Sequence, residues 1–160
     1  MDMEKEMQIN AYTPYEMSMI MERMHAINTS SEAKDYGTGE LFYSVEIHIL
    51  SSIAENPGIS VTELARKWNR TKGAVSQILK KLESKELIYR KKDDDDKRKS
   101  FLYASKLGIK LHEAHVAYDT KNYEKFFEQL TKHCTQEQIW QTFGVLEKWI
   151  ELSQEWHSIW

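Results

Sequence analysis

The chain has 160 residues, of which 41% are hydrophobic and 29% are charged, and its net charge is −3. This length allows one compact domain with additional helices, and the composition is that of a foldable, soluble protein. A single cysteine excludes an intramolecular disulfide framework and a cysteine-based zinc finger. The first residues lack the basic start and apolar run of a signal peptide, and no stretch of 18 apolar residues occurs, so a cytoplasmic protein is expected.

The first predicted helix begins after Thr13. Thr13 and Glu16 have the spacing of a capping box, and Pro14 occupies the first helical position. The helix carries an apolar stripe of methionine and isoleucine, at Met17, Ile20, Met21, Met24 and Ile27. Such a stripe usually packs in a core or against a partner, although it also suits the wall of a pocket for an apolar ligand. Residues 28–40 are rich in turn-forming residues and are expected to form a loop.

The next predicted helix covers residues 41–54 and places His48 at an apolar register beside Ile49. Asn56-Pro57-Gly58 stops this helix firmly. Ile59 is then expected to supply a brief third strand to the hairpin that follows later in the chain.

Two short helices separated by a three-residue break come next. Ser60 and Glu63 form a capping box that starts the first helix, which runs to about Trp68. Thr71 offers an N-cap to the second helix. The buried stripe of the second helix is Val75, Ile78, Leu79 and Leu82. Two helices this close must cross steeply, which is the helix-turn-helix arrangement.

The opposite face of the second helix is short, cationic and amide-bearing, and comprises Thr71, Lys72, Gly73, Ser76, Gln77 and Lys80. Glutamine and serine hydrogen-bond base edges in a DNA major groove, and lysine reaches bases or phosphates. Glycine inside a helix costs about 1 kcal/mol relative to alanine, and close approach to a phosphate chain would account for that cost. The alternative is an ordinary solvated helix face with scattered lysines.

Two strand-like runs, residues 86–90 and 100–104, flank a stretch in which every residue from 91 to 99 is charged. Such a hairpin cannot bury its tip and projects as a wing, so the whole stretch is predicted to be a winged-helix DNA-binding module. The charge distribution agrees. Residues 60–104 hold 13 of the 22 basic but only 7 of the 25 acidic side chains, so this module carries +6 and the remainder of the chain −9.

This stretch resembles the MarR family of bacterial winged-helix transcriptional regulators. The matching motifs are Thr62-Glu63-Leu64-Ala65, Lys72-Gly73-Ala74-Val75-Ser76 and Leu82-Glu83-Ser84-Lys85-Glu86-Leu87-Ile88, with Asp96, Lys97, Arg98, Ser105 and Gly108 in the wing pattern. Glu86 stands where the family usually has glycine, and Ser105 where it usually has threonine. The resemblance implies a homodimer, most often a repressor, on a pseudo-palindromic operator. It also implies DNA contacts by Lys97 and Arg98, with Asp96 holding Arg98 at the base of the wing.

Two long helices are predicted after the wing. Ser105 caps the first, and Thr135 opens the second through a capping box. Four of the five tryptophans lie between Trp140 and Trp160. Because other residues already fill the small DNA-binding core, these helices and the N-terminal helix are expected to form a helical dimer interface, as the resemblance also implies.

The predicted fold is therefore mainly α with a small β-wing, a winged helix-turn-helix with dimerisation helices at both ends. Residues 1–40 are expected to form an N-terminal dimerisation helix and loop, residues 41–104 the DNA-binding domain, and residues 105–160 the C-terminal dimerisation helices.

An effector site is suggested by three polar residues on two of the predicted helices. His115 and Asp119 are four residues apart and share a helix face, while His48 lies on the helix before the helix-turn-helix. In the family these helices meet at the effector pocket, and its zinc-sensing members place histidines at the three aligned positions. The fatty-acid-synthesis branch, which the chain also resembles, responds instead to acyl carriers. Zinc at His48, His115 and Asp119, an acyl or other organic effector, and no physiological ligand remain three open alternatives.

Motifs for catalysis are missing from the sequence, which has no Gly-rich phosphate loop, nucleophile elbow or HExxH. The predicted function is therefore sequence-specific binding of double-stranded DNA by a homodimeric transcriptional regulator with a small-molecule effector, and no membrane or enzymatic role is expected. The alternative is a winged-helix protein-interaction module without specific DNA binding.

Overall fold

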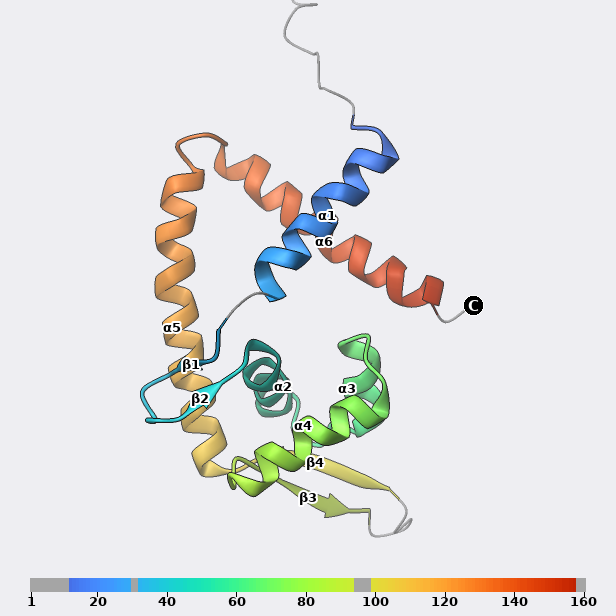
Figure 1. The fold of residues 1–160 in the computed structure, drawn as a ribbon, viewed down its shortest axis with the longest axis vertical. Helices are drawn as coiled ribbons and strands as arrows, with labels where there is room; N and C mark the ends of the chain where they lie inside the picture. The colour runs from blue at the N-terminus through green and yellow to red at the C-terminus, as the bar shows by residue number, and fades with distance from the viewer. Residues whose placement is uncertain (1–11, 30–31, 94–98, 158–160) are drawn as a thin grey trace, which may run out of the picture. The chain divides into compact units, whose positions relative to one another are not determined.

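The computed structural model describes residues 12–29, 32–93 and 99–157. These residues contain six helices and two small antiparallel sheets, which confirms the expected fold, mainly α with a β-wing (Figure 1). The chain divides into two compact units, Met1–Ala33 and Lys34–Trp160. No helix in the described ranges is long and apolar enough to cross a membrane.

The first unit contains α1, Pro14–Thr29. Its predicted capping box is present, because the Thr13 N–H donates to Glu16 Oε2 (2.8 Å) and the Glu16 N–H donates to Thr13 Oγ1 (3.3 Å). The Thr13 N–H and the Thr13 hydroxyl (2.8 Å) both donate to the Glu16 carboxylate, and these two hydrogen bonds lower the pKa of the Glu16 carboxyl. Much of the predicted apolar stripe is exposed in the single chain, at Met17, Ile20, Met24 and Ile27. An apolar face of this kind suits contact with another helix.

The second unit opens with a small hairpin where the sequence analysis expected a loop and the start of a helix. Strand β1, Lys34–Asp35, pairs antiparallel with β2, Leu41–Phe42, and helix α2 covers Ser44–Glu55. The Asp35 carboxylate closes the turn by accepting the N–H groups of Gly37, Thr38 and Gly39. Phe42 is buried in the core. The expectations of a loop to residue 40 and a helix from residue 41 are therefore wrong, because the Asp35 turn and Phe42 burial fix this hairpin.

The core of the second unit lies around α2 and the helix-turn-helix, which consists of α3, Val61–Lys67, and α4, Lys72–Ser84. The fully buried side chains are Ile47, Ile49, Leu50, Ile53, Leu64, Val75, Leu79, Leu82, Leu102 and Leu111. Burying one such side chain stabilises the fold by about 1.5–3 kcal/mol. Both predicted N-caps are confirmed: Ser60 Oγ accepts the Glu63 N–H (3.2 Å), and Thr71 Oγ1 accepts the Ala74 N–H (3.1 Å).

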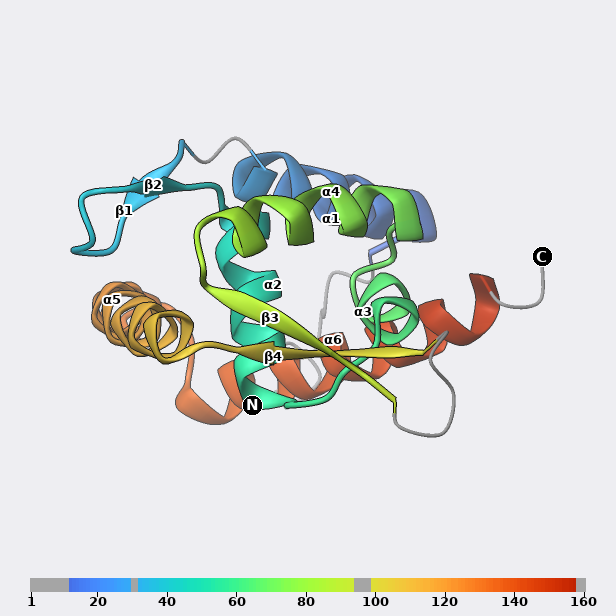
Figure 2. The same cartoon turned by 90° about the horizontal axis from the view of Figure 1, so that it is seen from below.

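The wing is a two-stranded antiparallel sheet of β3, Ile88–Lys92, and β4, Ser100–Ala104. Figures 1 and 2 show the two strands lying side by side after the end of α4. Residues 94–98 at its tip lie outside the described residues. The expected contribution of Ile59 is confirmed as a single bridge to Leu102, whose N–H donates to the Ile59 carbonyl (3.0 Å).

The turn that leaves α4 places a glutamate where the backbone conformation favours glycine. Glu86 has φ +56°, a left-handed conformation that costs an L-residue roughly 1–2 kcal/mol. The turn nevertheless forms, because the Leu87 N–H donates to the Leu82 carbonyl (3.0 Å) and the Ser105 hydroxyl donates to the Glu86 carbonyl (2.7 Å).

Replacing Glu86 by glycine is therefore expected to stabilise the protein by about 1 kcal/mol, because glycine adopts positive φ without the steric cost. In a chain of this size, this gain raises the melting temperature by roughly 2–4 °C. Thermal unfolding monitored by circular dichroism measures it. Glu86→Ala is the matched control and should bring no such gain, since alanine keeps the strained Cβ. Equal stabilisation by alanine would show that the glutamate side chain, and not its backbone conformation, carries the cost.

Two long helices complete the second unit: α5, Lys106–Leu130, and α6, Gln136–His157. Ser105 caps α5 as predicted, since its Oγ accepts the Gly108 N–H (3.0 Å). Thr135 and Gln138 form the predicted capping box of α6. Large apolar side chains remain exposed on α6, at Trp140, Phe143, Val145, Trp149, Ile150 and Leu152.

Candidate nucleic-acid interface and effector site

The outward face of α4 carries the residues that the sequence analysis predicted to meet DNA. Of these, Thr71, Lys72, Gly73, Gln77 and Lys80 are exposed, and Ser76 is half-buried. A Cβ on Gly73 would meet only Thr71 Oγ1, at 3.9 Å, so no contact among the described residues requires glycine there. The glycine therefore fits a close approach from outside the chain.

Two basic residues of the wing make different contacts with the rest of the fold. Arg90 Nε donates to Glu83 Oε1 at 2.6 Å, which binds the strand β3 to α4. Lys91 Nζ lies over the ring of Tyr103, 5.0 Å from its centroid. Lys97 and Arg98, predicted to contact DNA, and Asp96, predicted to hold Arg98, lie outside the described residues, so their roles remain predictions.

A buried acid on α2 holds that helix to α4. Glu46 is buried, and its Oε1 accepts a hydrogen bond from Lys81 Nζ at 2.9 Å. Its other oxygen accepts the Tyr43 N–H (3.1 Å) at the start of α2. The hydrogen bond and charge of Glu46 raise the pKa of Lys81. Lys81 therefore links α4 to α2, whereas its neighbour Lys80 belongs to the outward face of α4.

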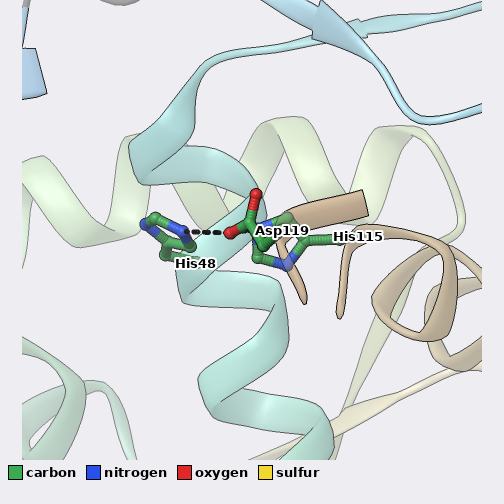
Figure 3. Close-up of side chains that lie close together, drawn as sticks. All are labelled: His48, His115 and Asp119. Atoms are coloured by element: carbon green, nitrogen blue, oxygen red, sulfur yellow. Dashed lines mark ion pairs between the residues drawn. The ribbon is translucent and has the colours of Figure 1, made fainter. Parts of the chain in front are cut away.

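The three predicted effector-site residues come together between α2 and α5 (Figure 3). Asp119 Oδ2 lies 3.0 Å from His115 Nε2 and 3.7 Å from His48 Nε2. One ligand atom from each of the three residues lies within 4.8 Å of the others. His115 is 5% exposed, whereas about a third of the His48 and Asp119 side chains is exposed, so the cluster opens to solvent on one side.

Serine hydroxyls contact the far nitrogen of both cluster histidines. Ser51 Oγ lies 3.1 Å from His115 Nδ1 and 3.0 Å from His112 Nδ1, and Ser44 Oγ lies 3.3 Å from His48 Nδ1. A hydroxyl has one proton, so Ser51 can donate to only one of its two histidines and accepts from the other. If His115 donates from Nδ1, its Nε2 presents a lone pair towards Asp119, which is the tautomer that a metal ligand needs.

The electrostatics of the site favour a neutral His115. Burial lowers its pKa most strongly; His48 and His112 lower it further, while Asp119 opposes them. Tyr36, from the hairpin β1–β2, packs edge-on against the His115 ring at 5.1 Å, and burial followed by the charge of Asp119 raises the pKa of Tyr36. His115 Nε2 is buried without a well-aligned hydrogen bond among the described residues, although Asp119 lies close enough for an ion pair.

The distances from Asp119 to the two histidines suit a small cation with tetrahedral coordination. Zinc bound at about 2.0–2.1 Å places neighbouring ligand atoms about 3.3 Å apart. The observed 3.0 and 3.7 Å separations bracket that value. Two imidazole nitrogens and one carboxylate oxygen are also a ligand set that suits zinc and leaves a fourth position open.

Comparison with known proteins agrees with the DNA-binding architecture. The sequence profile of the MarR family matches residues 42–100. The Bacillus subtilis HTH-type transcriptional regulator YhjH is 30% identical over 124 residues, which cover 76% of this chain and 71% of YhjH. The chain belongs to the MarR family. As a MarR-family protein it is a DNA-binding transcriptional regulator, and the members it resembles are regulators rather than enzymes.

Solved MarR-type structures share the fold. The transcriptional regulator SlyA superimposes with a TM-score of 0.69 at 19% identity, over 91% of this chain and 97% of SlyA. Staphylococcus aureus MepR, in a structure of its complex with DNA, gives a TM-score of 0.60 at 26% identity, over 88% of this chain and 97% of MepR.

Some features of this MarR protein's site had no signal in the sequence that we recognised. Ser51 is one turn from His48 on α2, so helical spacing alone could have placed it near the cluster. Tyr36 lies in a segment without periodicity, and nothing in that segment indicated a contact with His115. Trp68, whose ring stacks on His48 with centroids 5.9 Å apart, was noted only as the end of a helix.

Proposed function

We propose that this protein is a homodimeric, effector-responsive repressor that binds a pseudo-palindromic operator through α4 and the wing. The observation that carries the proposal is the exposed face of α4, where two lysines, an amide and a glycine share one side of a helix that the Lys81–Glu46 ion pair holds against α2. The MepR structure contains DNA, and its 26% identity to this chain supports the same partner here.

Dimerisation is supported by the apolar surface that a single chain leaves exposed. Six large side chains of α6 and much of the α1 stripe are open to solvent. Monomeric proteins seldom expose large apolar patches, and dimers of the commonest type bury the same patch of both chains. A twofold dimer presents two copies of α4 to successive major grooves, roughly 34 Å apart.

A transition-metal ion is the effector that the geometry favours. The His48, His115 and Asp119 ligand atoms converge from two helices to within 4.8 Å of one another, and the Ser51 contact can fix the required tautomer. Lowering of the His115 pKa by burial keeps protons from competing for this ligand near neutral pH. Acyl ligands are the alternative effector class, and operator binding should be measured with zinc and with an acyl ligand in parallel.

Substitutions on α4 are expected to separate base recognition from phosphate attraction. Gln77→Ala should reduce discrimination between operator and mutated operator by about 1–3 kcal/mol, because an amide reads base edges. Lys80→Ala should weaken binding to all sequences alike and reduce the slope of log affinity against log salt by about 1, because a lysine–phosphate contact releases one counterion. Fluorescence anisotropy on operator and random duplexes at several salt concentrations measures both effects.

Lys121→Ala, an exposed lysine of α5, is the control for a simple change of net charge and should alter neither quantity. Sedimentation of the operator complex should give two chains per operator. Wild-type protein that binds no duplex at low salt would contradict the proposal and favour the alternative of a protein-interaction module.

A further inference from the structure

Trp68 contacts the His48–His115–Asp119 cluster and lies in the segment that leads into α4, the helix proposed to read DNA. Its indole stacks on the His48 imidazole, with ring planes 9° apart and centroids 5.9 Å apart. Its Nε1–H donates to Ser52 Oγ at 3.1 Å, and Ser52 is buried. His48 and Ser52 are one turn apart on α2, so the two contacts lay the indole along a single face of that helix.

The backbone that follows Trp68 is short and closed by hydrogen bonds. Trp68 is the C-cap residue of α3, and the next two N–H groups, of Asn69 and Arg70, donate back to carbonyls of α3 at 3.1 and 2.9 Å. Asn69 has φ +45°, and Thr71 then caps α4 directly. Because no flexible linker separates the two helices, a displacement of Trp68 is expected to move the first turn of α4, where Lys72 faces outward.

We infer that Trp68 couples occupancy of the His48–His115–Asp119 site to the position of α4. The inference rests on the proposed function, in which that site binds a metal ion. Coordination requires His48 Nε2 to approach Asp119 Oδ2, now 3.7 Å away, and makes the imidazole electron-poor. The first change moves the ring on which the indole rests, and the second strengthens its attraction to the indole π face. Trp68 therefore transmits the movement of the His48 ring and its stronger attraction to the α3–α4 turn.

The test compares operator affinity with zinc and with chelator in wild type, Trp68→Leu and Trp68→Phe. Wild type is expected to show an affinity ratio of roughly 5–150-fold between the two conditions. Trp68→Leu should bring that ratio to within about twofold of unity, because the aromatic contact to His48 is lost. Trp68→Phe keeps an aromatic ring and should keep most of the ratio. Zinc affinity measured by calorimetry should change less than about 10-fold in both variants, because all three ligands remain.

Two further measurements distinguish coupling from a structural role. Zinc should change the tryptophan fluorescence of the wild type more than that of Trp68→Phe. Ser52→Ala removes the indole hydrogen bond but leaves the stack, and should reduce the ratio only in part. If circular dichroism shows that Trp68→Leu does not fold, the zinc-to-chelator ratios of operator affinity in Trp68→Phe and Ser52→Ala are compared instead. A greater reduction of this ratio in Ser52→Ala than in Trp68→Phe contradicts a coupling through the stack.

The outcomes separate this inference from the function on which it rests. An operator response to zinc that is equally large in wild type and Trp68→Leu overturns the coupling role and leaves metal-responsive regulation intact. A wild type whose operator affinity is indifferent to zinc overturns metal-responsive regulation, and the role of Trp68 falls with it.

Discussion

Replacing His115 by alanine is expected to lower zinc affinity by at least about 100-fold and to abolish the zinc dependence of operator binding. Loss of an outer-shell partner alone typically costs 10–100-fold, and His115 is a direct ligand in the proposed site. It is also the one buried member of the cluster, placed 3.0 Å from Asp119 and contacted by Ser51 on its other nitrogen. Without it, two partly exposed side chains remain, which is too few for a stable zinc site.

The measurement is a calorimetric zinc titration followed by operator binding in zinc, in chelator and with a long-chain acyl ligand. His133→Ala is the matched control, because that histidine is exposed beyond α5 and should leave zinc affinity unchanged. Asp119→Asn keeps the side-chain shape and tests the carboxylate without opening a cavity. Zinc binding of wild-type strength in His115→Ala would place the metal elsewhere, whereas a response to the acyl ligand alone would favour the organic effector.

Features of the fold that depend on neighbouring residues were predicted from the sequence most accurately. The capping boxes at Thr13, Ser60 and Thr135 all form, because each is closed by hydrogen bonds between residues three apart. The hairpin β1–β2 was missed because two-residue strands have no measurable periodicity. Its position depends on the Asp35 turn and on burial of Phe42 against residues distant in sequence.

In the candidate site, too, local contacts were predictable from the sequence and contacts between distant segments were not. The spacing of His115 and Asp119 predicts a shared helix face, and the structure places their atoms 3.0 Å apart. The addition of His48 depended on family resemblance, because no local pattern joins His48 to His115, which lies more than 60 residues later in the chain. The Ser51 contacts and the Glu46–Lys81 pair also link distant segments. Such contacts follow from how helices pack, and each helix alone gives no sign of them.

The packing of α5 against Leu87, the residue before β3, gives the largest expected effect on stability. A Cβ built on Gly108 would lie inside van der Waals contact of the Leu87 carbonyl oxygen and 3.0 Å from the carbonyl carbon. The same oxygen accepts the Ser105 N–H (2.9 Å), so it cannot move away without breaking the start of α5. Both obstructing atoms are backbone, and Leu87 itself is buried. This close approach accounts for glycine in the first turn of the helix.

Gly108→Ala is therefore expected to destabilise the protein by about 4 kcal/mol, at the upper end of single substitutions. Against a total stability of roughly 5–15 kcal/mol, such a loss leaves the protein marginally folded at 37 °C. Urea unfolding followed by circular dichroism measures it. Gly73→Ala is the matched control, because its Cβ meets no atom closer than 3.9 Å. That substitution should stabilise α4 by up to about 1 kcal/mol while weakening operator binding. Equal stability of the two alanine variants would mean that α5 and the Leu87 carbonyl are not in close contact in solution.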